Sequence, residues 1–78
     1  MYVTAIQGKG KIGFLDCFEI KDKLKKLGSR WHSDEAIWVL TTSDDITTVM
    51  KKIDVHGEDY RVGDVLDCNG LQSDILFR

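Results

Sequence analysis

Both tryptophans of this chain lie in one short segment, residues 30–40, which reads RWHSDEAIWVL and constrains the fold more than any other part of the sequence. We interpret this segment as a β-hairpin. If Asp34 and Glu35 form the turn, Trp31 lies directly opposite Trp38, and the two indoles share one face of the hairpin. Tight hairpin turns favour Gly or Asn, so an Asp-Glu turn is also compatible with a longer loop that preserves the same pairing.

The second strand of this hairpin, residues 36–40, is apolar at every position. In the same register Arg30 pairs with Val39. His32 pairs with Ile37, so the side chains of Ile37 and Val39 point away from the indoles. A strand that is apolar on both faces is typical of the centre of a sheet that is covered on both sides. We therefore expect each face of the sheet to have a cover.

Two amphipathic helices are predicted, one before and one after the hairpin. The first begins near Asp16, which forms a capping-box variant with Glu19, and it ends at Gly28. Its apolar stripe consists of Cys17, Ile20, Leu24 and Leu27. The second helix follows residues 42–45, whose Thr, Ser and Asp side chains are typical helix caps. Its apolar stripe consists of Ile46, Val49, Met50 and Ile53.

The two ends of the chain supply the remaining predicted strands. Residues 2–7 are rich in β-forming side chains and are predicted as the first strand. Residues 60–68 are predicted as the last main strand, with a bulge at residues 63–64 where the alternation breaks. The glycine-rich segment between the first strand and the first helix, residues 8–13, is predicted to have no regular structure.

This order of elements, βαββαβ, is the ferredoxin-like arrangement. We therefore predict an α+β fold with an antiparallel four-stranded sheet and two helices on one face, in a single domain that spans residues 1–78. Residues 69–70, Asn-Gly, predict a turn. Residues 73–78 are predicted as a short extra strand or a tail.

The helices of such a fold cover only one face of the sheet, so the other face needs a partner. A chain of 78 residues is close to the size at which a single core is marginally stable, and burial between subunits would stabilise it. We therefore predict a homodimer whose interface includes Trp31, Trp38 and Leu40. A flat ligand such as a nucleic-acid base is the alternative occupant of the open face.

The charge of the chain is unevenly distributed, although its formal net charge is only -2. Through His32 there are seven basic and three acidic residues, whereas from Ser33 onward there are four basic and ten acidic residues. A basic first half is typical of a surface that faces an anion.

Five basic residues are candidates for contacts with the phosphates of a nucleic acid. Lys9 and Lys11 lie within the glycine-rich segment, whose backbone N–H groups can also face an anion. Lys21 and Lys25 have no acidic residue four positions before them to pair with. Together with Arg30 these lysines predict weak, sequence-independent binding that decreases with salt. Solvated lysines in a loop and on a helix face are the alternative interpretation.

Several other site types are excluded by spacing. Residues 8–13 match G-x-G-x-x-G, but Asp34, at the distance of a ribose-binding acid, lies in the predicted hairpin turn and not at the end of a parallel strand. The cysteines and histidines lack the close spacing of zinc ligands. We therefore predict no catalytic residue, no metal and no cofactor, and we expect Cys17 and Cys68 to be free thiols.

The sequence has no apolar run of membrane-spanning length, and its first residues lack the layout of a signal peptide. We therefore expect a soluble, cytoplasmic protein with no membrane partner.

Two strings of the sequence resemble a known family. LKKLGSRWH at residues 24–32 and IWVLTT at residues 37–42, followed by a helix that ends in KKID, look like the SinR-like branch of the small ferredoxin-fold CRISPR spacer-acquisition subunits and their VapD-like toxin relatives. The resemblance covers most of residues 2–68 in pattern. It implies a homodimer with facing sheets and a role with nucleic acid.

In its active members that family implies a metal-dependent ribonuclease with an aspartate at the end of the first strand. Here this strand ends in Ala5-Ile6-Gln7, without a carboxylate to hold magnesium. We therefore expect a non-catalytic dimeric interaction module that is associated with nucleic acid. Two alternatives stay open: a toxin-like metal-dependent endoribonuclease, and a small phage or mobile-element protein that binds and inhibits a host protein.

Overall fold

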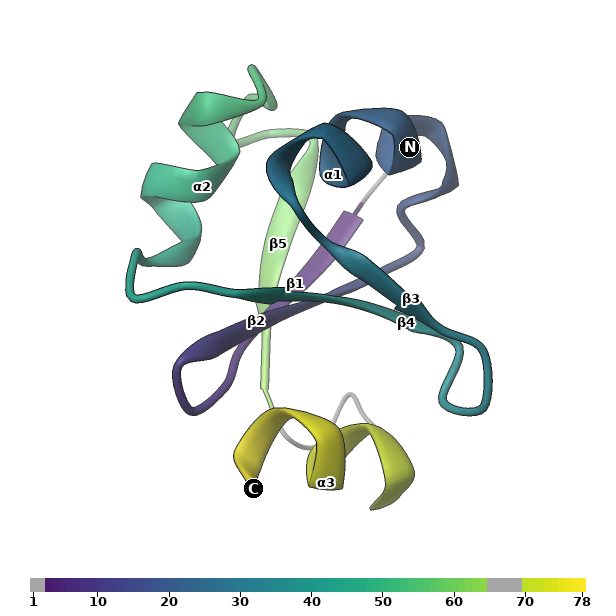
Figure 1. The fold of residues 1–78 in the computed structure, drawn as a ribbon. Helices are drawn as coiled ribbons and strands as arrows, with labels where there is room; N and C mark the ends of the chain where they lie inside the picture. Colours follow the sequence, from purple (N-terminus) through teal and green to yellow (C-terminus); the bar gives the residue numbers. More distant parts are fainter. Residues whose placement is uncertain (1–2, 65–69) are drawn as a thin grey trace.

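Five strands form one mixed sheet in the order β3-β4-β2-β1-β5, with helices on both of its faces (Figure 1). The computed structural model describes residues 3–64 and 70–78, the last helix by its backbone alone over residues 70–73. The strands are β1 Val3–Gln7, β2 Lys11–Leu15, β3 Arg30–His32, β4 Ile37–Thr41 and β5 Tyr60–Gly63. The helices are a 3₁₀ turn η1 Phe18–Ile20, α1 Lys21–Leu27, α2 Ile46–Lys52 and α3 Gly70–Phe77.

The tryptophan hairpin has the predicted register. β3 and β4 are antiparallel, and Trp31 pairs with Trp38. The loop between the two strands covers residues 33–36, and Ala36 at its end has a left-handed φ of 54°. The predicted pairing is therefore confirmed, and the loop is longer than the two residues of a tight turn.

The glycine-rich segment, residues 8–13, was predicted to be irregular; this is confirmed for residues 8–10 and wrong from Lys11 onward. Residues 8–10 form the turn of a second hairpin, in which the Gly8 N–H donates to the Lys11 carbonyl at 2.7 Å. The segment then continues as β2, which pairs antiparallel with both β1 and β4. Ile12 and Phe14 alternate into the core on one face of β2. A strand forms because these two side chains gain burial, which outweighs the low strand propensity of the glycines.

The first helix begins later than predicted, and Asp16 is not its cap. Asp16 has a left-handed φ of 54° and is followed by η1, while the N-cap of α1 is Ile20, which makes no side-chain cap hydrogen bond. The predicted end is confirmed, because Gly28 caps α1 with a φ of 104° that suits glycine. The predicted apolar stripe is also confirmed: Leu24 is fully buried and Leu27 packs beside it.

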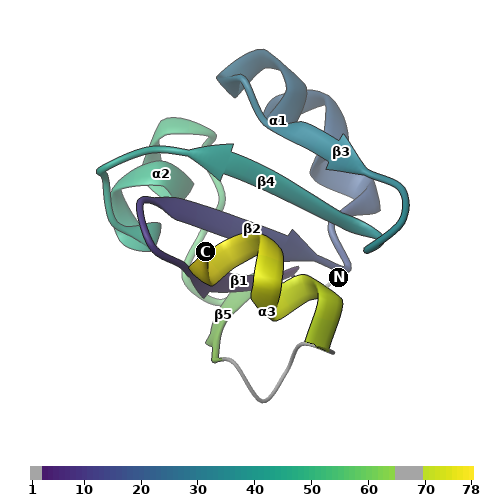
Figure 2. The same ribbon diagram turned by 60° about the horizontal axis from the view of Figure 1, so that its bottom comes forward.

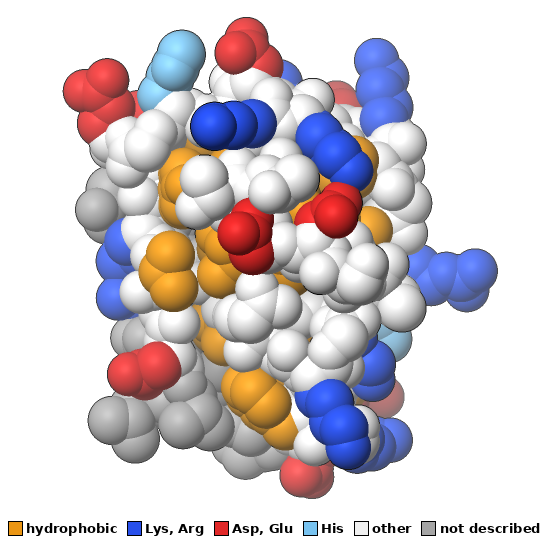
Figure 3. Space-filling view, turned by 90° about the vertical axis from the view of Figure 1, so that its left-hand side faces the viewer, with side chains coloured by type: hydrophobic (Ala, Val, Ile, Leu, Met, Phe, Trp, Pro, Cys, Tyr) orange, Lys and Arg blue, Asp and Glu red, His pale blue; other side chains and the backbone are white. Residues whose placement is uncertain are grey.

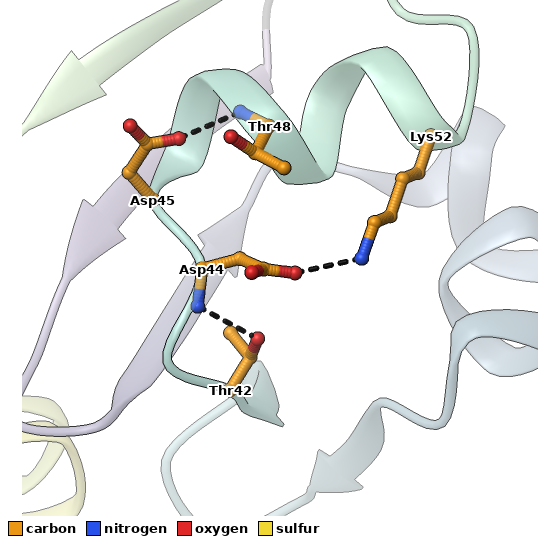
Figure 4. Close-up of polar contacts among 5 residues, drawn as sticks. All are labelled: Thr42, Asp44, Asp45, Thr48 and Lys52. Atoms are coloured by element: carbon orange, nitrogen blue, oxygen red, sulfur yellow. Dashed lines mark hydrogen bonds and ion pairs between the residues drawn. The ribbon is translucent and has the colours of Figure 1, made fainter.

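The second helix begins at the predicted capping signal (Figure 4). The Thr48 backbone N–H donates to the Asp45 side chain at 2.7 Å, which makes Asp45 the N-cap of α2. The Lys52 Nζ, at the end of α2, forms an ion pair with the carboxylate of Asp44, which precedes the helix, at 2.7 Å. The Thr42 hydroxyl in turn accepts a hydrogen bond from the Asp44 backbone N–H at 3.0 Å.

Helices α1 and α2 lie on one face of the sheet and bury the main core (Figure 1). The core holds residues from β1, β2 and β4 together with the apolar stripes of both helices. Its buried members are Val3, Ala5, Ile12, Phe14, Cys17, Leu24, Leu40, Ile46, Val49, Met50 and Ile53.

The other face of the sheet is covered by α3, which lies across it (Figure 2). Ile75 and Leu76 pack against Ile6, Ile37 and Val39 in a second core. The prediction of a short strand or tail at residues 73–78 is therefore wrong. The face that was expected to need a partner is covered by the chain's own C-terminal helix.

The α+β class is confirmed, but the observed sheet is not the predicted four-stranded antiparallel one. β2 lies between β1 and β4, and β5 pairs parallel with β1. The last strand ends at Gly63, one residue before the undescribed segment 65–69, which contains most of the rest of its predicted range. Of the predicted turn at residues 69–70, residue 69 lies outside the described residues, and Gly70 is the first residue of α3. None of the described helices is long and apolar enough to cross a membrane.

Candidate functional site

A pocket of about 530 Å³ lies beside α1, on the α1–α2 face of the sheet and toward the β3 edge. We call it the aromatic pocket, because four of its lining side chains are aromatic. Its lining residues are Phe14, Asp16, Cys17, Phe18, Lys21, Lys25, Trp31, Ala36 and Trp38. This volume lies in the range of pockets that hold small molecules or parts of larger ligands.

The two indoles form one wall of the aromatic pocket. The hairpin register places Trp31 and Trp38 directly opposite each other, and their ring centroids are 5.6 Å apart at an interplanar angle of 48°. Trp38 packs against the main core, whereas Trp31, on the edge strand, is 50% exposed. The core thus fixes one indole and leaves the other available to a ligand.

Phe18 adds a second accessible ring. It is the first residue of η1 and lies outside the apolar stripe of the helix, so its side chain is 73% exposed. Exposure of two large aromatic side chains beside one hollow is uncommon unless the surface binds something.

Two lysines of α1 hold positive charge over the rings of the aromatic pocket. The Lys21 Nζ lies 4.3 Å from the centroid of the Phe18 ring. The Lys25 Nζ lies 5.9 Å from the centroid of the Trp38 ring. These lysines are four residues apart and therefore lie on the same side of α1. An apolar hollow with two cations at its rim favours a ligand that has both a flat ring and a negative charge.

The cysteine of the aromatic pocket is poorly suited to nucleophilic catalysis. The Cys17 thiol donates to the Phe14 carbonyl, with a sulfur–oxygen distance of 3.7 Å. Burial, with a smaller contribution from the negative charge of Asp16, raises the pKa of the Cys17 thiol from 9.0 to about 11. The thiol is therefore protonated at neutral pH, and only the thiolate is strongly nucleophilic. Among residues 3–64 and 70–78, no three His, Cys, Asp or Glu side chains form a group that could hold a metal ion.

Four of the residues singled out in the sequence meet at the aromatic pocket: Lys21, Lys25, Trp31 and Trp38. Leu40, predicted as an interface residue, is buried in the main core and is only 7% exposed. Phe18 was missed, although an aromatic residue outside the apolar stripe of its helix was the available signal.

The other three predicted phosphate contacts lie elsewhere. Lys9 is in the β1–β2 turn, where its backbone N–H donates to the Leu76 carbonyl at 2.7 Å. The Lys11 Nζ donates to the Ile75 carbonyl at 3.1 Å, so it has a structural role at the end of α3. Arg30 pairs with Val39, whose side chain packs on the α3 face. The predicted basic surface is thus divided between two faces of the sheet.

On the described part of the α2 side, both basic and acidic side chains lie on the surface, and hydrophobic side chains form small separate patches (Figure 3). Comparison of the chain with protein-family models, with curated proteins and with solved structures finds no match. A function for this chain must therefore follow from the geometry of its own site.

Proposed function

We propose that this chain is a non-catalytic binding module that takes single-stranded nucleic acid in the aromatic pocket. The observation that carries the proposal is the placement of the Lys21 and Lys25 ammonium groups over aromatic rings at the rim of an apolar hollow. Proteins that bind single strands without sequence preference combine aromatic stacking platforms with a positively charged path for the backbone.

The exposed rings supply the stacking platforms. Trp31 and Phe18 present faces that are half or more exposed, on two different elements that border the pocket. Stacking of a base on an aromatic side chain contributes about 1–3 kcal/mol and tolerates any base. Bases inside a duplex are already stacked on each other and cannot enter such a hollow, which favours a single strand.

The lysines supply the phosphate contacts. Lys25 is exposed and Lys21 is partly exposed, so their flexible side chains can turn from the rings toward a backbone that passes the rim. Lysine is a point charge and reads no base edge in this arrangement, which favours binding that is independent of sequence.

The test is fluorescence anisotropy with a labelled single-stranded oligonucleotide at several salt concentrations. Lys21→Glu/Lys25→Glu should abolish binding at low salt. The matched control is Lys23→Glu/Lys26→Glu, because Lys23 and Lys26 lie on the same helix, line a different hollow and give the same change in charge. The control should retain binding at low salt.

Salt dependence gives the number of phosphate contacts. The log–log slope for the wild type should change by about 0.7 for each contact with a single strand. If the two double variants lose the same amount of binding affinity, the loss comes from net charge alone. That result would contradict the assignment of binding to the aromatic pocket. Cleavage of the oligonucleotide that EDTA abolishes would favour the endoribonuclease, and absence of binding at low salt would favour a protein partner.

A further inference from the structure

We propose that β3 pairs with β3 of a second copy of this chain, so that two sheets become one continuous sheet across a twofold axis at Trp31. This pairing goes beyond the proposed function and does not depend on it. β3 lies at the end of the sheet, and in the described part of the chain no strand pairs with its outer side. The unpaired N–H and C=O groups of an edge strand form a template for another strand.

The faces of the sheet leave little else for a partner. α1 and α2 pack on one face of the sheet and α3 packs on the other, so the chain itself covers much of the face that was expected to need a partner (Figures 1 and 2). The half-exposed Trp31 lies on the β3 edge. A second strand beside β3 would bury part of this indole.

The three residues of β3 are self-complementary in an antiparallel pairing centred on Trp31. Trp31 then lies opposite Trp31 of the second copy, and Arg30 lies opposite His32 of that copy. Directly opposed aromatic side chains form favourable cross-strand pairs.

The charges of the adjoining loop complement this register. Asp34 lies in the β3–β4 loop two residues after His32, which this register places opposite Arg30 of the second copy, so Asp34 would lie near that arginine. Both Arg30 and Asp34 are exposed, and neither has an ion-pair partner among the described residues. The twofold axis would create two such Arg30–Asp34 ion pairs, which specify this register and a second copy as the partner.

The pairing also extends the aromatic pocket. Antiparallel strands related by a twofold axis perpendicular to the sheet keep the same face, so α1 and Trp31 of both copies lie on one side. The two aromatic pockets would border each other, and each would gain Trp31 of the second copy. This extension, unlike the pairing, depends on the proposed function.

Sedimentation without nucleic acid tests the pairing first. At about 100 µM, where an interface of micromolar affinity is largely occupied, the wild-type chain should be a dimer. Asp34→Arg should weaken dimerisation at least tenfold, because it places an arginine near Arg30 of the other copy at both ends of the interface. The swap Arg30→Asp/Asp34→Arg should restore dimerisation. A monomer at this concentration, or a swap variant no better than Asp34→Arg, would overturn the proposal.

Cross-linking tests the register. In a Cys68→Ser background, chains with Arg30→Cys mixed with chains with His32→Cys should form disulfide-linked heterodimers on mild oxidation, faster than either chain alone. Residues directly opposite each other have Cβ atoms about 4.5–5.5 Å apart, which allows a disulfide after a small shift. Cys17 can stay because its thiol is buried.

The matched control is Val62→Cys on β5, the strand at the opposite end of the sheet and also exposed. Faster dimerisation through Val62→Cys than through the mixed chains would place the interface at β5 and overturn the proposal. The sedimentation and cross-linking measurements use no oligonucleotide. If the chain forms this dimer but does not bind single strands, only the proposed function is contradicted.

Discussion

Gly13 of β2 lies directly against Leu76 of α3. A Cβ atom added at Gly13 would lie 2.8 Å from the Leu76 Cδ1 atom and 2.8 Å from the Ile37 Cδ1 atom. Real side chains essentially never approach this closely. Leu76 therefore occupies the space that a side chain at position 13 would need. Leu76 is fully buried, and the second core is therefore built around a glycine.

Gly13→Ala should destabilise the protein by about 1–3 kcal/mol, the range expected for an extra methyl group in a packed core. Strand propensity alone favours alanine over glycine, so the sign of the effect distinguishes packing from propensity. Urea denaturation measures the change. The matched control is Gly57→Ala, where an added Cβ meets no atom within 4 Å. A Gly13→Ala variant as stable as the wild type would show that α3 does not pack at Leu76 in solution.

The same relationship explains why part of the fold could not be predicted from the sequence. The pairing of Trp31 with Trp38 and a helix cap within residues 42–45 depend on residues that are close in sequence, and both were predicted; the structure identifies Asp45 as the cap. The strand through Gly13 depends on Leu76, far along the chain, and no local pattern shows it. Asp16 was read as a cap because of Glu19, but its left-handed backbone makes a turn from β2 into η1 instead.

Several residues of the candidate site were predicted from the sequence, but their meeting in one pocket was not. Lys21, Lys25 and Trp31 were each singled out from the sequence, the lysines for lacking local partners and the tryptophan for its hairpin. These residues meet because α1 packs against β4. That packing is known only from the three-dimensional fold. Lys11 was grouped with these lysines by charge alone, but its ammonium group lies at the end of α3.

Asp45→Ala should lower the melting temperature at neutral pH, because it removes the carboxylate that accepts the Thr48 N–H at the start of α2. The Thr48 side chain and backbone N–H lower the pKa of Asp45 below 3.8. The ionised form is therefore favoured in the folded protein. Its contribution is present above the unfolded pKa and is lost as the pH falls through the folded pKa.

The difference in melting temperature between the wild type and Asp45→Ala should thus be constant from pH 7 to about pH 5 and decrease below about pH 4. Asp44→Ala is the control, since its ion pair with Lys52 joins side chains that are 37% and 53% exposed. Exposed pairs contribute only about 0–1 kcal/mol. A difference for Asp45→Ala that persists unchanged to pH 2 would contradict a charge-dependent cap.

Cys17 should react slowly with thiol reagents in the folded protein. Because burial raises its pKa from 9.0 to about 11, its thiolate fraction at pH 8 is about a hundredfold below that of an ordinary thiol. The measurement is the rate of reaction with a coloured disulfide reagent at pH 8, in a Cys68→Ser variant, with and without denaturant. A rate that denaturant leaves unchanged would contradict the burial of Cys17.

The raised pKa also predicts a loss of stability in alkaline solution. The protonated thiol is favoured in the folded state, so its contribution is fully present below about pH 9 and is lost as the pH rises toward about 11. Cys17→Ala should therefore lose less stability than the wild type between these pH values. Melting temperatures of both proteins across this interval, each compared with its own value at pH 7, measure the difference.

The two tryptophans should report ligand binding unequally. Trp31 is half exposed at the rim of the aromatic pocket, whereas Trp38 packs against the main core. A stacked base should therefore quench the fluorescence of Trp31 strongly and that of Trp38 weakly. Trp38→Phe leaves Trp31 as the reporter, and Trp31→Phe leaves Trp38. Titration of each variant with an unlabelled single strand should give strong quenching only in the first.

Affinity should follow the same asymmetry. Trp31→Ala should weaken binding of the single strand by about 1–3 kcal/mol, the contribution of one stacked base. Trp31→Phe should retain most of the affinity, because phenylalanine still offers a ring on which a base can stack. Anisotropy titrations at one fixed low salt concentration compare the three proteins directly. If Trp31→Ala binds as tightly as the wild type while Lys21→Glu/Lys25→Glu does not bind, the lysines attract the strand without any stacking on β3, and the bases do not enter the aromatic pocket at Trp31.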